Sequence, residues 1–514
     1  MKISLQDFRT STLKQTTAPH RLASGFMPSY TDLASESSDS NFRDKVNPPY
    51  PLVLSPALTT LATKTSKRIV AMVEKSSPVI TSSVSKVAYS TNEWDVFFDD
   101  PAEENFTTDP GSPSANDNVD IEIFQGSVIT SFYSDGNLRF NAGATSTAWS
   151  SHTGDDTSTS SIKLFRKFRN GLMVSDVSYI RELTSGFVLA AAASSFRLVV
   201  SNVVMTIKDF NNFADQYMVV FFENTLSTSS IVYGQTDWVL WNGVDTNYEF
   251  KKTLRGKYRC SITRDNTIYA FTQLGTTVVC WQFTGNDFRE FGRISNLIIS
   301  TELPNPKMRV SLEKDFFVLM ATSPGNISAE SPFYWNPQTG ENFFLAEQTT
   351  DALGLMITQQ SDGAYQRYIS SVSGSADSVL QKITLENSTR FSDGKYKSGI
   401  IPITDEKGNP ARGKIKRVIL EYNDAPASVS DRINFTFNTK DETEQETLTT
   451  NTAIIKDTTE NSTNANVTDK RAIMDFNPYA TEFDISLTTD FTTGSYWLII
   501  RRIVIEYDLV IVKQ

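Results

Sequence analysis

Three aspartates in this 514-residue chain have the chemistry for acid–base catalysis. Asp215, Asp237 and Asp315 each precede a segment with strand character. Two or three carboxylates that converge on one point cleave glycosidic bonds, with one acting as the proton donor and another as the nucleophile or base. An aspartate just before a strand is also a common turn residue, so nothing in the spacing singles out these three. We predict no catalytic residue and keep glycoside cleavage as an alternative.

Histidine and cysteine are too scarce to suggest other site chemistry. The only histidines, His20 and His152, lie in polar loop-like segments, which argues against a histidine metal site and against a Ser–His nucleophile. Cys260 and Cys280 lie in strand-like runs, so we predict buried free thiols rather than a disulfide. The sequence has no glycine-rich phosphate loop and no HExxH motif. We therefore predict neither a metal nor a cofactor.

Charge is distributed unevenly along the chain. The formal net charge is -11, which argues against a protein that grips nucleic acid through a basic surface. The one dense basic run, Lys163–Arg169, contains two phenylalanines that could stack on bases, but its pattern favours a strand with one wet face and one buried face. The acidic stretch 99–120 is predicted to be a solvated loop, with calcium binding as the alternative, although no EF-hand spacing is present.

One hairpin pattern occurs three times in the sequence and organises the chain. Its copies occupy Asp237–Phe250, Thr277–Phe288 and Pro332–Leu345. In each, an aromatic or β-branched run ending near Trp241, Trp281 or Trp335 is followed by a turn rich in Asn, Gly and Thr and by a second aromatic strand. The tryptophans are 40 and 54 residues apart, a spacing that suits four-stranded repeats. Repeats of this length are typical of a β-propeller.

Further strand pairs extend the repeat over residues 51–398, for which we predict about six or seven blades. A short helix is predicted between Ser55 and Glu74, where apolar residues follow a Ser-Pro start, although the threonine-rich middle also suits a strand. Loop insertions are expected near 99–120 and 143–161. The predicted strand pairs are Gly186–Ala191 with Phe196–Val200 and Tyr365–Tyr368 with Leu380–Leu385, while Tyr217–Phe222, Thr267–Phe271 and Phe316–Met320 each lead into one of the Trp hairpins.

For residues 399–514 we predict a separate β-sandwich. Lys416–Asn423 and Arg501–Asp508 match position by position, 85 residues apart, and both alternate Val or Ile before ending in Glu-Tyr. We predict that these two strands lie side by side. A long insertion is expected near 440–470.

The first 50 residues are polar and show no apolar period. We predict that residues 1–50 are either disordered or form an extended arm that lies along a partner. The start of the chain lacks the apolar core of a signal peptide, and no stretch approaches 18 apolar residues. A soluble protein made in a cytoplasm is expected.

An acidic propeller with an N-terminal arm and a sandwich carrying Arg501–Asp508 resembles the tail-hub or nozzle proteins of short-tailed bacteriophages. The resemblance rests on the Trp hairpins and on the paired strands that end in Glu-Tyr. It implies a non-enzymatic virion tail protein, made in the host bacterial cytoplasm, that forms a homo-oligomeric ring, most simply a hexamer. It also implies contacts with the adaptor or portal and with tail fibre or spike proteins, and a channel through which genomic DNA passes without specific binding. It implies no catalytic, cofactor or metal residue.

Other classes of function stay open on the sequence. A carbohydrate- or receptor-binding propeller would present aromatic residues, and a different head–tail or minor capsid component would share the architecture. A cytoplasmic scaffold of the WD type should carry Gly-His and Trp-Asp dipeptides, whereas this chain has only Trp94-Asp95 and no Gly-His.

Overall fold

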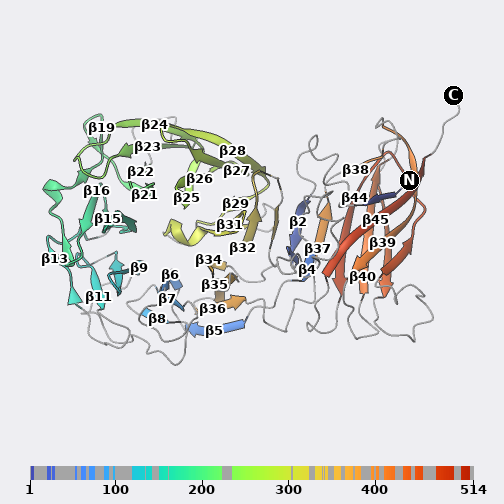
Figure 1. Ribbon diagram of the computed structural model, residues 1–514, viewed down its shortest axis with the longest axis horizontal. Helices are drawn as coiled ribbons and strands as arrows, with labels where there is room; N and C mark the ends of the chain where they lie inside the picture. Colours follow the sequence, from blue (N-terminus) through green and yellow to red (C-terminus); the bar gives the residue numbers. More distant parts are fainter. Residues whose placement is uncertain are drawn as a thin grey trace, which may run out of the picture. The chain divides into compact units, whose positions relative to one another are not determined.

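The structure is a computed structural model of the chain, drawn in Figure 1. Its contacts divide the chain into two compact units. Unit 1 comprises Met1–Ala57, Phe333–Glu347 and Glu386–Gln514, and unit 2 comprises Leu58–Pro332 and Gln348–Leu385. The residues that the structure describes are 2–4, 20–24, 26–28, 52–54, 59–64, 69–75, 86–91, 96–98, 118–133, 135–141, 150–159, 161–222, 234–301, 305–322, 330–338, 340, 342–344, 352–359, 365–373, 377–383, 395–398, 401–403, 410–422, 432–440, 446–454, 471–490 and 499–509.

Between β5 (Thr59–Lys64) and β36 (Asp377–Ile383), the described residues form a succession of mostly antiparallel sheets in chain order. The first three contain β6 (Ile69–Lys75), β7 (Lys86–Thr91) and β8 (Val96–Phe98); β9 (Asn118–Phe124), β10 (Ser127–Phe132), β11 (Arg139–Asn141) and β12 (Ser150–Ser151); and β14 (Phe165–Phe168), β15 (Gly171–Asp176), β16 (Tyr179–Leu183) and β17 (Val188–Leu189), with β13 (Thr153–Gly154) and β18 (Phe196–Arg197) added.

A small hairpin of β19 (Val199–Val200) and β20 (Val203–Val204) precedes the remaining sheets. These sheets contain β21 (Ile207–Phe213), β22 (Tyr217–Phe222), β23 (Gln235–Trp241) and β24 (Phe250–Arg255); β25 (Lys257–Arg264), β26 (Thr267–Leu274), β27 (Thr277–Phe283) and β28 (Phe288–Ser295); β29 (Ile298–Ile299), β30 (Val310–Glu313), β31 (Phe316–Thr322), β32 (Ser331–Trp335) and β33 (Asn342–Phe344); and β34 (Ala352–Gln359), β35 (Tyr365–Ser373) and β36 (Asp377–Ile383), with β5 (Thr59–Lys64) at the edge.

These sheets stand around a common centre, as Figure 1 shows, with β21 and β25 toward the middle and β24 and β28 on the outside. The circle is closed by β5, which pairs antiparallel with β36 so that Thr63 lies opposite Val379. A strand from the start of the unit thus completes the sheet at its end and covers the edge of β36. The prediction of a mainly β chain with a β-propeller is confirmed.

The Trp hairpins occupy one recurring position in this circle. Each forms the last two strands of its sheet, as β23–β24, β27–β28 and β32–β33. Trp238 and Trp335 are fully buried, with 0% and 2% of their surfaces exposed, and Trp241 is 3% exposed. Trp238 meets the rings of Phe250, Phe283 and Phe288 edge-on. The hairpins therefore act as packing elements between sheets.

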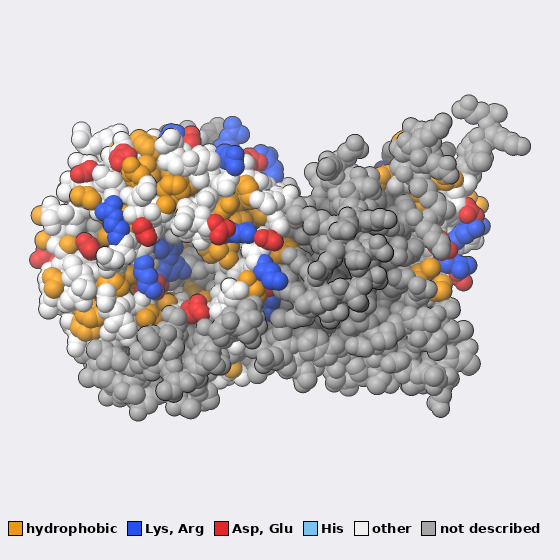
Figure 2. Space-filling model, in the orientation of Figure 1, with side chains coloured by type: hydrophobic (Ala, Val, Ile, Leu, Met, Phe, Trp, Pro, Cys, Tyr) orange, Lys and Arg blue, Asp and Glu red, His pale blue; other side chains and the backbone are white. Residues whose placement is uncertain are grey.

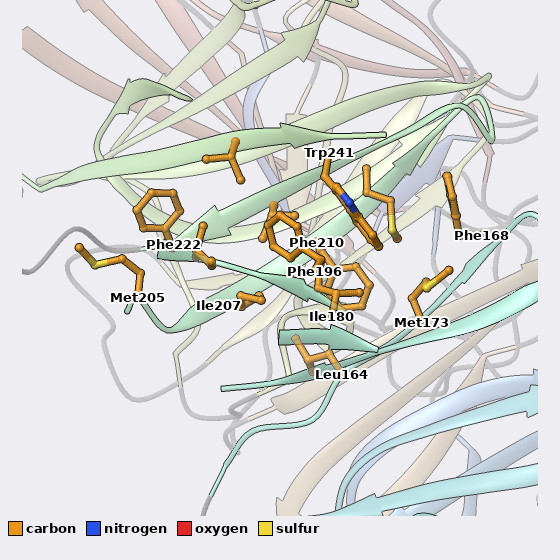
Figure 3. Close-up of a cluster of buried hydrophobic side chains, with 14 of the residues drawn as sticks. Leu164, Phe168, Met173, Ile180, Phe196, Met205, Ile207, Phe210, Phe222 and Trp241 are labelled. Carbon is orange, nitrogen blue, oxygen red and sulfur yellow. The ribbon is translucent and has the colours of Figure 1, made fainter. Parts of the chain in front are cut away.

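Apolar side chains fill the space between neighbouring sheets. Figure 3 shows one such cluster, formed by the sheets β14–β18 and β21–β24. Phe196 and Trp241 stack at a tilt with ring centroids 4.9 Å apart, while Phe210 and Phe222 are fully buried beside them. Each buried side chain of this size contributes about 1.5–3 kcal/mol by leaving water. Packing of this kind fixes each sheet against the next.

Unit 1 contains two larger sheets. One has β3 (Phe26–Pro28), β4 (Leu52–Leu54), β45 (Ile499–Leu509), β39 (Gly413–Tyr422) and β42 (Arg471–Asp475), with β1 (Lys2–Ser4) and β43 (Tyr479–Ala480) added. The other has β2 (His20–Ser24), β37 (Lys395–Ser398), β44 (Glu482–Asp490), β40 (Arg432–Lys440) and β41 (Glu446–Ile454), with β38 (Ile401–Pro402) added. Phe437 in β40 meets Phe476, just after β42, edge-on at 4.7 Å, so aromatic rings join the two sheets.

The match between Lys416–Asn423 and Arg501–Asp508 reflects direct pairing. β39 and β45 run antiparallel, with Val418 opposite Ile505 and Leu420 opposite Ile503, and all four side chains are buried. The prediction that the repeated strands lie side by side is confirmed.

Several expectations about local structure are wrong. Residues 55–74 contain the strands β5 and β6 where a helix was predicted, because β-branched residues and ring closure outweigh the helical spacing. β17 and β18 both pair with β16 and not with each other. The expected insertions also contain strands, with β12 and β13 in 143–161 and β41 in 440–470.

The N-terminal segment also differs from its prediction. β1 pairs with β45 and β2 pairs with β37, so residues 2–4 and 20–24 join sheets of their own chain. Sheet edges offer unpaired N–H and C=O groups, which a strand can satisfy without any apolar period of its own. Unit 1 also resumes at Glu386, earlier than the predicted boundary at 399, because β37 pairs with β44. The acidic residues 99–117 lie outside the described residues.

Candidate functional site

The three candidate carboxylates lie in different local settings. Asp237 is buried in β23, with its carboxylate 2.6 Å from the Lys251 ammonium and accepting a hydrogen bond from Thr253. Asp215 lies in the exposed turn before β22, whose far end, Phe222, pairs with Asp237. The backbone of β22, roughly 17 Å long, therefore lies between the position of Asp215 and that of Asp237. Glycosidases need about 5–10 Å, so Asp215 and Asp237 do not form a catalytic pair.

Asp215 and Asp315 instead belong to contacts between turns. Asp315 forms an ion pair with Arg264 at 2.9 Å, which joins the turn after β30 to the turn after β25. The Arg169 backbone N–H donates to Asp215, and the Arg169 side chain donates to the Asp215 carbonyl oxygen, each over 3.2 Å. In both cases the first turn of one sheet is tied to the first turn of the next. These carboxylates link successive sheets.

Charged groups are also buried between sheets. Asp209 in β21 is fully buried and lies 2.9 Å from the Arg166 guanidinium in β14, and it accepts a hydrogen bond from the Tyr258 hydroxyl of β25. Burial, followed by the nearby Asp209 charge, raises the pKa of Tyr258 well above its ordinary value. A single carboxylate thus connects three sheets. Arg166 comes from the basic run, in which Phe165 and Phe168 are buried and Lys167 is exposed. Because Phe165 and Lys167 share one face of the strand, the predicted division into one solvated and one buried face is wrong.

The 3-10 helix η2 (Pro306–Arg309) runs inside the circle of sheets and appears in Figure 1 as the yellow helix near the middle. Asn305 begins it, with its side chain accepting from the Lys307 N–H and donating to Asp120 of β9. Met308 packs on β6, β35 and β36, and Gly354 leaves the space that the Met308 side chain fills. Arg309 donates to the Arg259 carbonyl oxygen of β25 over 2.9 Å. Because β34, β35 and β36 belong to one sheet, these contacts join this short segment to four sheets.

Two acidic side chains hold η2 in place, and their pKa values are shifted in opposite directions. The Lys307 ammonium lies 2.7 Å from Asp120 and 3.3 Å from Glu122. Burial raises the pKa of Asp120 above its ordinary 3.8, although Lys307 opposes the shift. Burial also acts to raise the pKa of Glu122, but Lys307 and Lys167 together hold it below 4.5.

A cavity of about 450 Å³ opens beside η2. Its lining residues come from the starts of the inner strands β21 and β25, from η2 and from five connecting segments: Tyr133, Ser161, Ile162, Val177, Thr206, Ile207, Lys208, Tyr258, Arg259, Thr301, Pro306 and Arg309. Three of these carry positive charge and none carries a carboxylate. Figure 2 shows Lys and Arg as well as Asp and Glu side chains around the hollow of the propeller on the face in view. In a chain of net charge -11, this wall is locally basic.

No sequence pattern pointed to these lining residues, because they are scattered over residues 133–309 and meet only at the centre. The residues that the sequence did single out have structural settings. Cys260 and Cys280 are free and buried, as predicted. His152 is buried, and its Nδ1 accepts the Leu138 N–H at 3.0 Å. Within the described part of the chain, no group of three His, Cys, Asp or Glu side chains could hold a metal ion, and no helix is long and apolar enough to cross a membrane.

Comparisons with known proteins give structural neighbours only. No protein-family model matches the sequence, and no curated protein matches it either. Solved structures with similar chains include Saccharomyces cerevisiae Sqt1, with 9% identity, 64% of this chain and 100% of that chain covered, and a TM-score of 0.41. The Neurospora crassa Pan2 WD40 domain has 6% identity, covers 64% of this chain and 96% of its own, and has a TM-score of 0.41.

An exo-β-1,3-galactanase from Phanerochaete chrysosporium is also similar, with 9% identity, 67% and 95% coverage and a TM-score of 0.28. A WD40 domain and a galactanase thus both occur among the neighbours. The assignment to the β-propeller class rests on the strand pairing described above.

Proposed function

We propose that this chain is a non-enzymatic structural subunit of a bacteriophage tail, forming a homo-oligomeric nozzle or hub ring that docks other tail proteins. The observation that carries the proposal is the use of its buried charges. Asp209, Asp120 and Glu313 each form an ion pair with a cation from another sheet or from η2. Side chains used in this way hold a rigid body together, and rigid bodies suit assemblies with closed symmetry.

The glycoside-cleaving alternative has less support. Its chemistry needs two carboxylates that flank the bond to be broken, whereas the cavity at the centre has three cations and no carboxylate in its lining. Asp237 is already held by Lys251.

The test is the oligomeric state of the full-length chain together with its presence in particles. Mass photometry of the purified chain, alone and with adaptor and portal proteins, is expected to show one closed ring, hexameric in the simplest case. Proteomics of purified virions is expected to find the chain in stoichiometric amount with the tail. A chain that stays monomeric with these proteins and is missing from virions would exclude the proposal. Turnover of glycans that is lost in Asp237→Asn would favour the enzyme.

A further inference from the structure

The cavity beside η2 combines fixed positive charge with an apolar rim. Lys208 is exposed, while Arg259 and Arg309 are half-buried in the wall. Two arginines and a lysine around one opening create a positive potential that a low-dielectric wall strengthens. Guanidinium groups match the planar oxygens of a carboxylate and form paired hydrogen bonds with it.

The position of Arg309 is set by the structure around it. Its Nη1 donates to the Arg259 carbonyl oxygen, which ties the end of η2 to the start of β25. The other end of η2 is fixed by the ion pair between Lys307 and Asp120. Burial lowers the pKa of Arg309 from its ordinary value, and the surrounding Asp209 and Glu330 oppose that shift. Because this guanidinium is held in place before any ligand arrives, binding would cost little side-chain entropy.

The two carboxylates that act on Arg309, Asp209 and Glu330, are both buried, and neither lines the cavity. Asp209 follows Lys208 in β21 but is fully buried, with Arg166 and Tyr258 as its partners. It compensates part of the positive charge without lining the opening. An incoming anion therefore meets cations and hydroxyl groups.

The rim favours a peptide over a nucleic-acid strand. Tyr133 and Ile162 expose 39% and 38% of their surfaces, and Val177 and Pro306 line the same opening. Apolar rim residues gain from covering side chains that flank an acidic group. A nucleic-acid strand would instead need an extended basic surface along its phosphates, which the net charge of -11 does not favour.

We propose that this cavity binds an acidic peptide segment of a partner protein, with Lys208, Arg259 and Arg309 receiving a carboxylate and the Tyr133–Ile162 rim receiving an adjacent apolar side chain. The inference is independent of ring formation, because it concerns the isolated chain. Its failure would leave the proposed tail role untouched.

Fluorescence anisotropy of a labelled peptide of alternating Glu and Leu, titrated with the full-length chain, tests the proposal. We expect saturable binding that weakens with salt and falls about tenfold in Arg259→Gln, as the loss of one charge-assisted hydrogen bond would produce. Lys208→Gln is expected to weaken binding too, and its exposed position leaves the fold unaffected. The matched control is Arg293→Gln, an exposed arginine paired with Glu290 on β28, which should bind like the parent chain.

Three results would overturn the assignment. The first is an absence of peptide binding at low salt by the folded parent chain. The second is tighter binding of a single-stranded oligonucleotide of equal charge with the same sensitivity to Arg259→Gln, which would assign the cavity to phosphate. The third is equal weakening by Arg293→Gln, which would show that only net charge matters.

Discussion

Arg367 of β35 donates through its Nε to the Glu313 carboxylate of β30 over 2.7 Å, and a second hydrogen bond from Nη2 completes a paired contact. The two side chains are 2% and 1% exposed. They join two successive sheets of the propeller by charge in a place where water is excluded. Similar pairs recur between Arg166 and Asp209 and between Lys307 and Asp120.

Removing one partner of this pair should destabilise the propeller strongly. Arg367→Met leaves the Glu313 charge buried and uncompensated, so we expect a loss of about 3–5 kcal/mol in the free energy of unfolding by urea. The double variant Glu313→Leu with Arg367→Met should recover most of that loss, because no lone charge remains. Arg293→Met breaks an exposed pair and should cost less than about 1 kcal/mol. Equal losses in both single variants would contradict the prediction.

Lys163 should make stability depend on alkaline pH. Its ammonium donates to the Phe132 carbonyl oxygen over 2.6 Å, and burial lowers its pKa from 10.5 to about 8, while Asp176 and Asp135 act in the other direction. Between these two pKa values the unfolded chain holds the proton more tightly than the folded chain, so the contribution of Lys163 to stability rises with pH. The free energy of unfolding rises by up to about 3 kcal/mol between the folded-state and unfolded-state pKa values.

Urea unfolding of the parent chain and of Lys163→Met is measured at about pH 8 and about pH 10.5. The variant is needed because other groups also titrate in this range. The difference between the two chains should change by most of that amount in favour of the parent chain as pH rises. A difference that does not change with pH would mean that Lys163 keeps its ordinary pKa.

The two cysteines should resist thiol reagents in the native chain. Cys260 and Cys280 are fully buried, and burial raises the pKa of both thiols, so little thiolate forms near neutral pH. Maleimide labelling followed by mass spectrometry should find neither thiol modified under native conditions and both modified in urea. Rapid native labelling of either cysteine would show that the sheets β25–β28 open locally.

Closure of the circle by β5 should stabilise the whole propeller against thermal unfolding. Replacing Thr59–Lys64 with glycine and serine weakens its pairing with β36 and leaves an open sheet edge. We expect a clear fall in Tm and faster proteolysis of β34–β36. Val203→Gly with Val204→Ser, in the exposed hairpin β19–β20, is the control and should change Tm little. An unchanged Tm in the β5 variant would show that closure adds no stability.

Much of the fold was accessible from local patterns. Trp241, Trp281 and Trp335 end or lie within strands that pair with the next aromatic strand, because a turn of Asn and Gly permits a tight hairpin. The similarity of Lys416–Asn423 to Arg501–Asp508 predicted their pairing, because both strands present the same buried face. The helix predicted at 55–74 failed because β5 pairs with β36, more than 300 residues away in sequence, and β6 pairs with β7.

The candidate site could not be predicted in this way. Its cations, Lys208, Arg259 and Arg309, come from separate strands and from η2, and no spacing along the chain relates them. Lys163, predicted to be part of a basic strand, is fully buried, and its ammonium group donates hydrogen bonds to the carbonyl oxygens of Phe132 and Tyr133.

The sequence by itself determined the β class, the recurring hairpins and the scarcity of histidine and cysteine chemistry, because these depend on the side-chain period and composition of short segments. Only the tertiary structure decided that β5 closes the circle, that η2 lies at its centre and that three cations surround one cavity. These are relations between residues far apart in the chain, and they arise from the packing of sheets against one another, which no local pattern encodes.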